Sequence, residues 1–375
     1  MNRREVTVIG RGIIGLCVAQ ALVEQGWQVT VIGPQALHGT ASRAAVGTSN
    51  LKGNISAQNP FFALKIAAHR GLEAWLDKLE RESERPIARS FTGAFEPFTD
   101  VDEYRYVRER VFHRQFTGCR DAKVVEQQWL KARFPRHEQF TSQSLGAYHY
   151  YRDLWFDPEQ CLEALEALLR RQGTLFLDDV VDAVVPQVDG GLELRLAGHG
   201  LRVSEAVLAA GIFSNQVLVN SGIPGISQEP VEGETLIAQL FGVDSLNLKV
   251  GKMNYVVHDG ILRAGSSSRR QSDLLKCSPC PETAIFLRQD AQRFIKFDSY
   301  RTVWGVRGRF KNRMPGIGSV FFPGFPSHRL WLALGFYKNG LQLGHLFANN
   351  LARLMDKPTA LSTAFPYPVD HLRGS

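Results

Sequence analysis

Hydrophobic residues near the start of the chain form first a short β-branched run and then a pattern with the spacing of a helix. Residues 6–9 are all β-branched and predict a short strand. Apolar residues recur at helical spacing over 16–23, and Gly26 follows them as a helix-terminating residue. A second β-branched run at 29–32 predicts another strand. This order is typical of a parallel βαβ unit.

Three glycines with the spacing G-x-G-x-x-G lie between the first strand and the helix. Gly10 allows a tight turn, Gly12 leaves room for a pyrophosphate to approach the backbone, and Gly15 lets the helix pack close to the strand. The amides of the first helical turn, which includes Ile13 and Ile14, attract phosphate through roughly half a unit of positive charge. Because the strand and helix flank the glycines, the pattern predicts a dinucleotide site.

The carboxylate that usually ends the second strand of such a unit is missing. Its role is to bind the ribose hydroxyls of the nucleotide. Gly33 stands at this position and Pro34 follows it. We therefore expect the adenosine ribose to have another partner or none, with weaker retention of the cofactor.

A loop of small and polar residues spans 39–50 and includes Ser42, Arg43 and Ala44. Its hydroxyls and free amides suit contact with a phosphate or a flat ring, and the alternative interpretation is a plain flexible loop. The following apolar pattern predicts a helix over 61–76. The charged and aromatic stretch 91–140 predicts strands and short helices of a second domain.

The rest of the chain alternates between strand and helix patterns. Asp157 is a good N-cap and Pro158 suits a first turn, so a helix should begin there. Other segments predict a hairpin at 180–196, a buried strand from 206, antiparallel strands over 233–264, a helix over 279–294, a strand over 330–334 and a helix over 341–355.

The formal net charge of +7 and the isoelectric point of about 9.2 allow an anionic cofactor, an anionic substrate or a nucleic acid without choosing among them. The five cysteines favour a reducing compartment. Cys277 and Cys280 form a single C-x-x-C pair, interpreted as loop thiols rather than a redox or metal site. The N-terminus leaves no room for a signal peptide, and polar residues interrupt the apolar run 6–32. We expect a cytoplasmic protein without a membrane span or a metal.

Four patches come in the order found in the D-amino-acid oxidase superfamily: the glycine fingerprint, Ala-Ala-Gly-Ile-Phe-Ser at 209–214, Trp-Gly-Val-Arg at 304–307 and Gly-Phe-Tyr-Lys-Asn-Gly at 335–340. The chain most resembles glycine oxidase and sarcosine-oxidase-like enzymes. The resemblance implies an α/β fold, with a Rossmann-like FAD-binding domain and a second antiparallel-sheet (α+β) substrate domain interleaved in sequence. The implied ranges are 1–60, 150–222 and 300–375 for the FAD-binding domain, and 61–149 and 223–299 for the substrate domain.

The resemblance also implies the cofactor and the site residues. FAD would lie against Gly10, Gly12, Ile13, Ile14, Gly15, Ser42, Arg43, Ala44, Val181, Ala210, Gly211, Gly335, Asn339, Gly340 and Leu341. Arg307 falls on the arginine that binds the substrate carboxylate in the family. Lys338 replaces a second arginine near substrate and flavin, and Tyr255 falls near a substrate-facing tyrosine.

The implied function is oxidation of the C–N bond of a small amine or amino acid by hydride transfer to the flavin. Two alternatives remain open. One is an FAD-dependent oxidase of a modified tRNA base, to which the basic and aromatic segment 105–114 would contribute; its other interpretation is a solvated helix face. The second is a non-catalytic FAD-binding accessory subunit, suggested by the fingerprint weakened at Gly33. The oligomeric state stays open.

Overall fold

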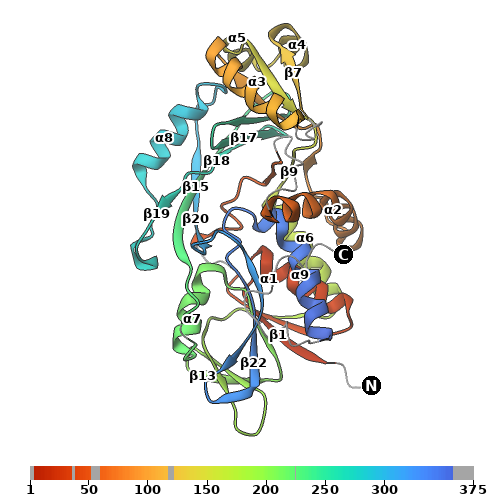
Figure 1. Ribbon diagram of the computed structural model, residues 1–375, viewed down its shortest axis with the longest axis vertical. Coiled ribbons are helices and arrows are strands. Elements are labelled where there is room, and N and C mark those ends of the chain that lie inside the picture. Colours follow the sequence, from red (N-terminus) through yellow and green to blue (C-terminus); the bar gives the residue numbers. More distant parts are fainter. Residues whose placement is uncertain (1–3, 36–38, 52–59, 117–121, 224, 358–375) are drawn as a thin grey trace.

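The structure is a computed structural model that describes residues 4–35, 39–51, 60–116, 122–223 and 225–357 (Figure 1). Within this part of the chain, two sheets form most of the molecule. A mainly parallel sheet with helices lies in the lower half of Figure 1, and a larger, mainly antiparallel sheet rises above it. No described helix is long and apolar enough to cross a membrane.

The first sheet has six strands, and all but its last edge pair are parallel. Its strands, in spatial order, are β10 (Leu175–Leu177), β2 (Gln28–Ile32), β1 (Glu5–Ile9), β14 (Ala206–Leu208), β22 (Phe325–Leu334) and β21 (Gly316–Phe322). Both faces are covered, which explains why the strand residues are apolar without alternation.

One face of this sheet shares an apolar core with four helices: α1 (Ile13–Glu24), α2 (Pro60–Ser83), α6 (Pro158–Arg171) and α9 (Gly340–Asp356). The other face is covered by α7 (Ser214–Asn220) and a small sheet of β11 (Val181–Pro186), β12 (Leu192–Leu196) and β13 (His199–Val203). The predicted cap of α6 is confirmed, since the Asp157 carboxylate accepts from the amides of Glu159 at 2.8 Å and Gln160 at 3.1 Å.

The second sheet has ten strands. Its path runs through β3 (Gly39–Thr40), β20 (Arg301–Arg309), β15 (Glu229–Gln239), β18 (Ile261–Gly265), β17 (Met253–His258), β16 (Leu246–Val250), β6 (Ala94–Phe98), β8 (Gly146–Tyr150) and β7 (Ala122–Glu126), with β19 (Arg269–Arg270) paired to β15. A further small sheet joins β4 (Thr48–Ser49), β9 (Leu154–Phe156) and β5 (Arg89–Ser90).

One face of the ten-stranded sheet carries an apolar core shared with α4 (Gln127–Arg133), α5 (Glu138–Gln143) and α8 (Pro281–Ala291). Helix α3 (Val101–Phe116) lies at the upper end of the molecule (Figure 1). The opposite face turns toward the parallel sheet and contributes to the cavity described below.

The predicted fold class is confirmed: a Rossmann-like sheet and a second antiparallel sheet are built from alternating stretches of the chain. Three elements, α2, β3 and β20, lie on the other side of the expected domain boundaries. Strand β3 falls within 1–60, yet it pairs with β20 in the ten-stranded sheet. Helix α2 falls within 61–149, yet its apolar residues pack in the core under the parallel sheet. Strand β20 falls within 300–375, yet it belongs to the ten-stranded sheet.

Candidate active site

A cavity of about 950 Å³ lies between the carboxyl ends of the parallel strands and the facing surface of the ten-stranded sheet. It is lined by the turns that follow β1, β2 and β14, by the loop 40–51, and by residues of β15, β16, β17 and β20. Ligands of open α/β sheets bind at this edge because helix N-termini and glycine turns collect there. The volume is at the upper end of the range for small-molecule sites.

The turn between β1 and α1 has the geometry of a phosphate cradle. Gly10 has a φ of +122°, and a Cβ atom there would lie 2.5 Å from the carbonyl oxygen of Ala209. Gly12 is the N-cap of α1 and faces the cavity. The Ser42 hydroxyl accepts a hydrogen bond from the Ile13 amide at 3.1 Å, so the loop 40–51 is tied to this helix N-terminus.

Most residues expected to contact the cofactor line the cavity, and they come from distant parts of the chain. They are Gly10, Gly12, Ile13, Ile14, Ser42, Arg43, Ala44, Val181, Ala210, Gly211, Gly335, Asn339, Gly340 and Leu341. Asn339 is the N-cap of α9, so a second helix N-terminus reaches the same space.

Gly15 was expected to contact the cofactor, but it does not line the cavity. A Cβ atom at this position would lie 1.9 Å from the carbonyl oxygen of Gly10. The missing side chain therefore lets α1 pack onto the end of β1, and this residue shapes the cradle without touching its contents.

The end of β2 has no space for the missing carboxylate. A Cβ atom at Gly33 would lie 2.9 Å from the amide nitrogen of Arg11. The Arg11 guanidinium turns to Glu166 on α6, with 2.9 Å between Nε and Oε1. Carboxylates reach the cavity instead from the segment after the neighbouring strand β10, where Asp179 and Asp182 line it.

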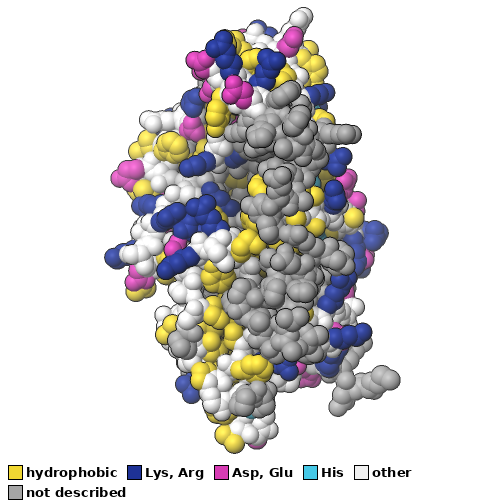
Figure 2. All heavy atoms as spheres, in the orientation of Figure 1, with side chains coloured by type: hydrophobic (Ala, Val, Ile, Leu, Met, Phe, Trp, Pro, Cys, Tyr) yellow, Lys and Arg dark blue, Asp and Glu magenta, His cyan; other side chains and the backbone are white. Residues whose placement is uncertain are grey.

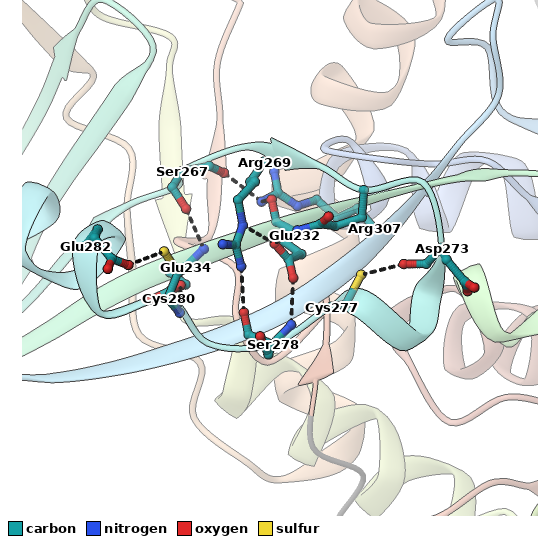
Figure 3. A network of polar contacts seen from close by, with 11 residues as sticks. Glu232, Glu234, Ser267, Arg269, Asp273, Cys277, Ser278, Cys280, Glu282 and Arg307 are labelled. Carbon is teal, nitrogen blue, oxygen red and sulfur yellow. Dashed lines mark hydrogen bonds and ion pairs between the residues drawn. The ribbon is translucent and has the colours of Figure 1, made fainter.

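Arg307 on β20 is the charged centre of the opposite wall. Its side chain is 7% exposed and lines the cavity. Nη2 donates to the carbonyl oxygens of Ser267 at 2.8 Å and Glu232 at 3.0 Å (Figure 3). No carboxylate among the described residues forms an ion pair with it, so burial lowers the pKa of Arg307 to about 10.

The position of this guanidinium depends on a glycine. Val231 and Gly233 on β15 lie opposite Arg307 and Gly305 on β20, and the side chain of Arg307 crosses over Gly233. A Cβ atom at Gly233 would lie 1.1 Å from Nη2 of Arg307. The strand can hold the guanidinium in this place only without a side chain there.

Lys338 and Tyr337 complete this wall. The Tyr337 ring centre lies 5.8 Å from Cζ of Arg307 and 5.8 Å from Nζ of Lys338. Lys338 lines the cavity and is exposed to solvent, although protein atoms surround much of its side chain. Burial, followed by the charges of Arg307 and Lys252, lowers the pKa of Lys338 to about 8. Arg307 and Lys338 are thus brought together as expected.

Tyr255 is a correction. It is fully buried on the face of β17 that packs against α8, and its hydroxyl donates to Asp290. Burial and this carboxylate raise the pKa of Tyr255. Because strand side chains alternate between faces, its neighbour Asn254 lines the cavity instead.

Several polar residues at this end of the cavity were not expected from the sequence. They are Asn50, Lys65, Lys249, Lys252, Asn254 and Tyr337. Lys249 and Asn254 lie opposite each other on β16 and β17, so they project from the same face. The alternation within 246–258 indicates that Lys249 and Asn254 share a face of the sheet, but it does not indicate which face meets the cavity.

Cys277 and Cys280 do not line the cavity and lie beside Glu232 and Glu234 of β15 (Figure 3). Ser278 donates its amide to Glu232 at 2.6 Å, and Cys280 donates its amide to Glu234 at 2.8 Å. Both cysteines are free, and burial raises the pKa of Cys277 to about 11. Such a thiol is weakly nucleophilic at neutral pH. The segment therefore braces the strand that carries Gly233.

The basic segment 105–114 lies on α3, away from the residues that line the cavity. Arg105 and Tyr106 are exposed, and Arg108 lies over the Tyr104 ring at 5.8 Å. The side chains of 107 and 110–114 lie outside the described residues.

A glycine cradle, two helix N-termini and a large cavity at the carboxyl edge of a parallel sheet define a dinucleotide-binding protein. The sequence profile of the DAO family, described as FAD dependent oxidoreductase, matches residues 5–354. The chain therefore belongs to this family. Its resemblance to the superfamily, its enzymatic nature and FAD as cofactor are confirmed.

A curated relative, the bifunctional protein ThiO/ThiG of Nostoc sp., is 24% identical over 396 residues. The match covers 97% of this chain and 55% of the relative, so the chain spans about half the length of that protein.

Solved structures share the fold over nearly their whole length. Glycine oxidase from Bacillus cereus superposes with a TM-score of 0.82 at 18% identity, covering 98% of this chain and 99% of that one. Iminodiacetate oxidase from Chelativorans sp. BNC1 gives 0.79 at 20% identity, covering 95% and 96%. L-α-glycerophosphate oxidase from Mycoplasma pneumoniae with FAD bound gives 0.76 at 16%, covering 96% and 97%. At these identities the likeness concerns the fold.

Proposed function

We propose that this oxidoreductase oxidises the C–N bond of a small amino acid or N-substituted amino acid whose carboxylate binds Arg307. The observation that carries the proposal is the buried guanidinium, which lines the cavity and has no ion pair with a described carboxylate. A guanidinium in this state favours an anionic partner, and its planar fork matches a carboxylate. Glycine oxidase and iminodiacetate oxidase, which share the fold, are named for substrates of this kind.

The residues present fit FAD. The pyrophosphate would lie against Gly12 and the N-terminus of α1, where a backbone without Cβ atoms and free amides meet the cavity. We infer that Asp179 takes the ribose contact that Gly33 cannot make, because it lines the cavity beside the end of β2. When bound, FAD accepts a hydride from the carbon that carries the amine.

The contribution of the chain is then to position and enclose the substrate. Arg307 fixes the carboxylate and thereby the orientation of the adjacent carbon. The Tyr337 ring limits the movement of Arg307 and Lys338. The sheet face around Gly233 and Asn254 closes the cavity, and Lys338 adds positive charge at this end of it.

An anaerobic titration of the purified protein tests the proposal. We expect an α-amino acid or an N-methyl amino acid to bleach the flavin absorbance, and the corresponding amine without its carboxylate to leave it unchanged. Equal bleaching by amines that lack a carboxylate would contradict the proposal.

Gly233→Ala should weaken carboxylate binding without removing any charge. The new methyl group occupies the place of Nη2 of Arg307, and a displacement of about 1 Å can lower kcat/KM by roughly 100-fold. Gly71→Ala is the matched control, because its Cβ atom would meet its nearest neighbour at an ordinary 3.5 Å. Steady-state kinetics of both variants test this prediction. Equal kcat/KM values for Gly233→Ala and Gly71→Ala would show that Arg307 does not need the space above Gly233.

Carboxylate binding should weaken as the pH rises through about 8. Lys338 is charged below its lowered pKa of about 8 and neutral above it, so its attraction for an anion is lost in that direction. Calorimetric titration with butyrate, which keeps one negative charge from pH 6.5 to 9, measures this loss of affinity. Lys338→Arg stays charged throughout and should flatten the profile. A wild-type profile without this decline would exclude Lys338 from the binding site.

A further inference from the structure

Three cations meet at the substrate end of the cavity. They are Arg307, Lys338 and Lys252, and the charges of the other two contribute to the lowered pKa of Lys338. None of the three forms an ion pair with a described carboxylate. Because adjacent like charges raise the free energy of the site, a single carboxylate on Arg307 leaves two positive charges uncompensated.

The two lysines lie at the boundary between two neighbouring cavities, which is called the passage below. Lys252 occupies the turn between β16 and β17, and Lys338 follows β22. Together with Ser266, which follows β18, they line both the main cavity and a second cavity of about 600 Å³. The remaining lining residues of the second cavity are Met253, Ser267, Ser268, Glu282, Thr283 and Phe286.

The carboxylates near this passage have other partners. Glu282 in the second cavity accepts from the Cys280 thiol at 3.1 Å. Asp273 in the main cavity accepts from the Leu275 amide at 3.1 Å. Both residues of β19, Arg269 and Arg270, are exposed, and Figure 2 shows Lys and Arg side chains gathered over the region where β15 and β19 run in Figure 1. Arg269 is paired with Glu232, and hydrogen bonds from a thiol or an amide leave Glu282 and Asp273 charged. The positive charge near the passage therefore comes from Lys252, Lys338 and Arg270.

We propose that Lys252, Lys338 and the Ser266 hydroxyl bind a second anionic group of the substrate, a carboxylate or a phosphate-like oxyanion at the end opposite the carboxylate held by Arg307. The preferred substrate is then a dianionic amine that extends from the main cavity toward the second one. This inference rests on the proposed function for the position of the first carboxylate.

Calorimetric titration of the FAD-loaded enzyme with three ligands that lack an amine tests this at low salt. Butyrate carries one anionic group, glutarate carries two carboxylates, and 3-phosphonopropanoate carries a carboxylate and a phosphonate. We expect at least one dianion to bind roughly tenfold more tightly than butyrate, with the advantage shrinking at high salt. The tighter of the two dianions identifies the preferred oxyanion.

Lys252→Gln should remove most of this advantage, weakening the dianion roughly fivefold and butyrate by less than about twofold. Lys276→Gln is the matched control, since this exposed lysine lines neither cavity and contacts Ser272. Arg307→Ala should weaken all three ligands, which separates failure of the proposed function from failure of this inference. The wild-type comparison decides the inference if Lys252→Gln does not fold.

Three results would overturn it. One is equal binding of butyrate and both dianions by the wild type. Another is a loss in Lys252→Gln that is as large for butyrate as for the dianion. The third is tight, salt-sensitive binding of unfractionated tRNA without discrimination among the three small ligands, which would assign these cations to a nucleic acid.

Discussion

Replacing Arg307 with alanine is expected to raise KM for the amino-acid substrate by about 30- to 5000-fold while FAD stays bound. Loss of one partner of a buried charge pair costs about 2–5 kcal/mol, because the carboxylate loses its hydrogen bonds in a site shielded from water. The cofactor should remain, since the glycine cradle belongs to the opposite wall of the cavity. Steady-state kinetics and the ratio of flavin to protein absorbance measure the two quantities.

Two further variants show whether the rise in KM is specific to the guanidinium of Arg307. Arg307→Lys keeps the charge but loses the planar fork, so an intermediate KM is expected. Arg301→Ala on the same strand removes an exposed arginine that does not line the cavity, and its kinetics should match the wild type. If Arg307→Ala and Arg301→Ala gave the same KM, the carboxylate would bind elsewhere.

Gly10→Ala is expected to lose FAD and to destabilise the fold by roughly 3–5 kcal/mol. Positive φ values cost a residue with a side chain about 1–3 kcal/mol. The Cβ atom would also lie 2.5 Å from the carbonyl oxygen of Ala209. The backbone of Ala209 would have to move, and with it the end of β14. Urea unfolding and the flavin content of the purified variant report the two effects.

Gly26→Ala separates these two causes. Gly26 also has a positive φ, of +84°, but a Cβ atom there would have no neighbour within 4 Å. Strain without overlap should cost about 1 kcal/mol and leave the flavin content unchanged. Equal losses in Gly10→Ala and Gly26→Ala would mean that backbone strain alone governs the cradle.

The nucleotide cradle is predictable from the sequence because its signal is local. Gly10, Gly12, Gly15 and the flanking apolar periods lie within thirty residues, and Gly15 answers a steric demand of Gly10 itself. Arg307 is different, since its place depends on Gly233, which lies far from it in the chain. Its expected role came from resemblance rather than from any local pattern.

The residues that sequence reasoning missed depend on contacts between distant segments. Tyr255 and Asn254 are adjacent, and which of them faces the cavity is decided by where α8 packs. The backbone of Arg11 fills the space beside Gly33, and its guanidinium binds Glu166 on a helix far along the chain. Lys252 reaches the cavity because a hairpin turn places it there. Alternation within 246–258 shows which residues share a face, but the sequence does not show which distant segment each face meets.

The strand order of the parallel sheet has a consequence for how this enzyme is made. Strand β22, synthesised long after β1, lies beside β14, which in turn lies beside β1. A nascent chain emerging from the ribosome therefore carries β1 and β2 with their final neighbours still unmade, and such late pairing is slow and prone to aggregation. A premature stop before β22 is accordingly expected to produce insoluble, chaperone-bound polypeptide rather than a smaller flavoprotein.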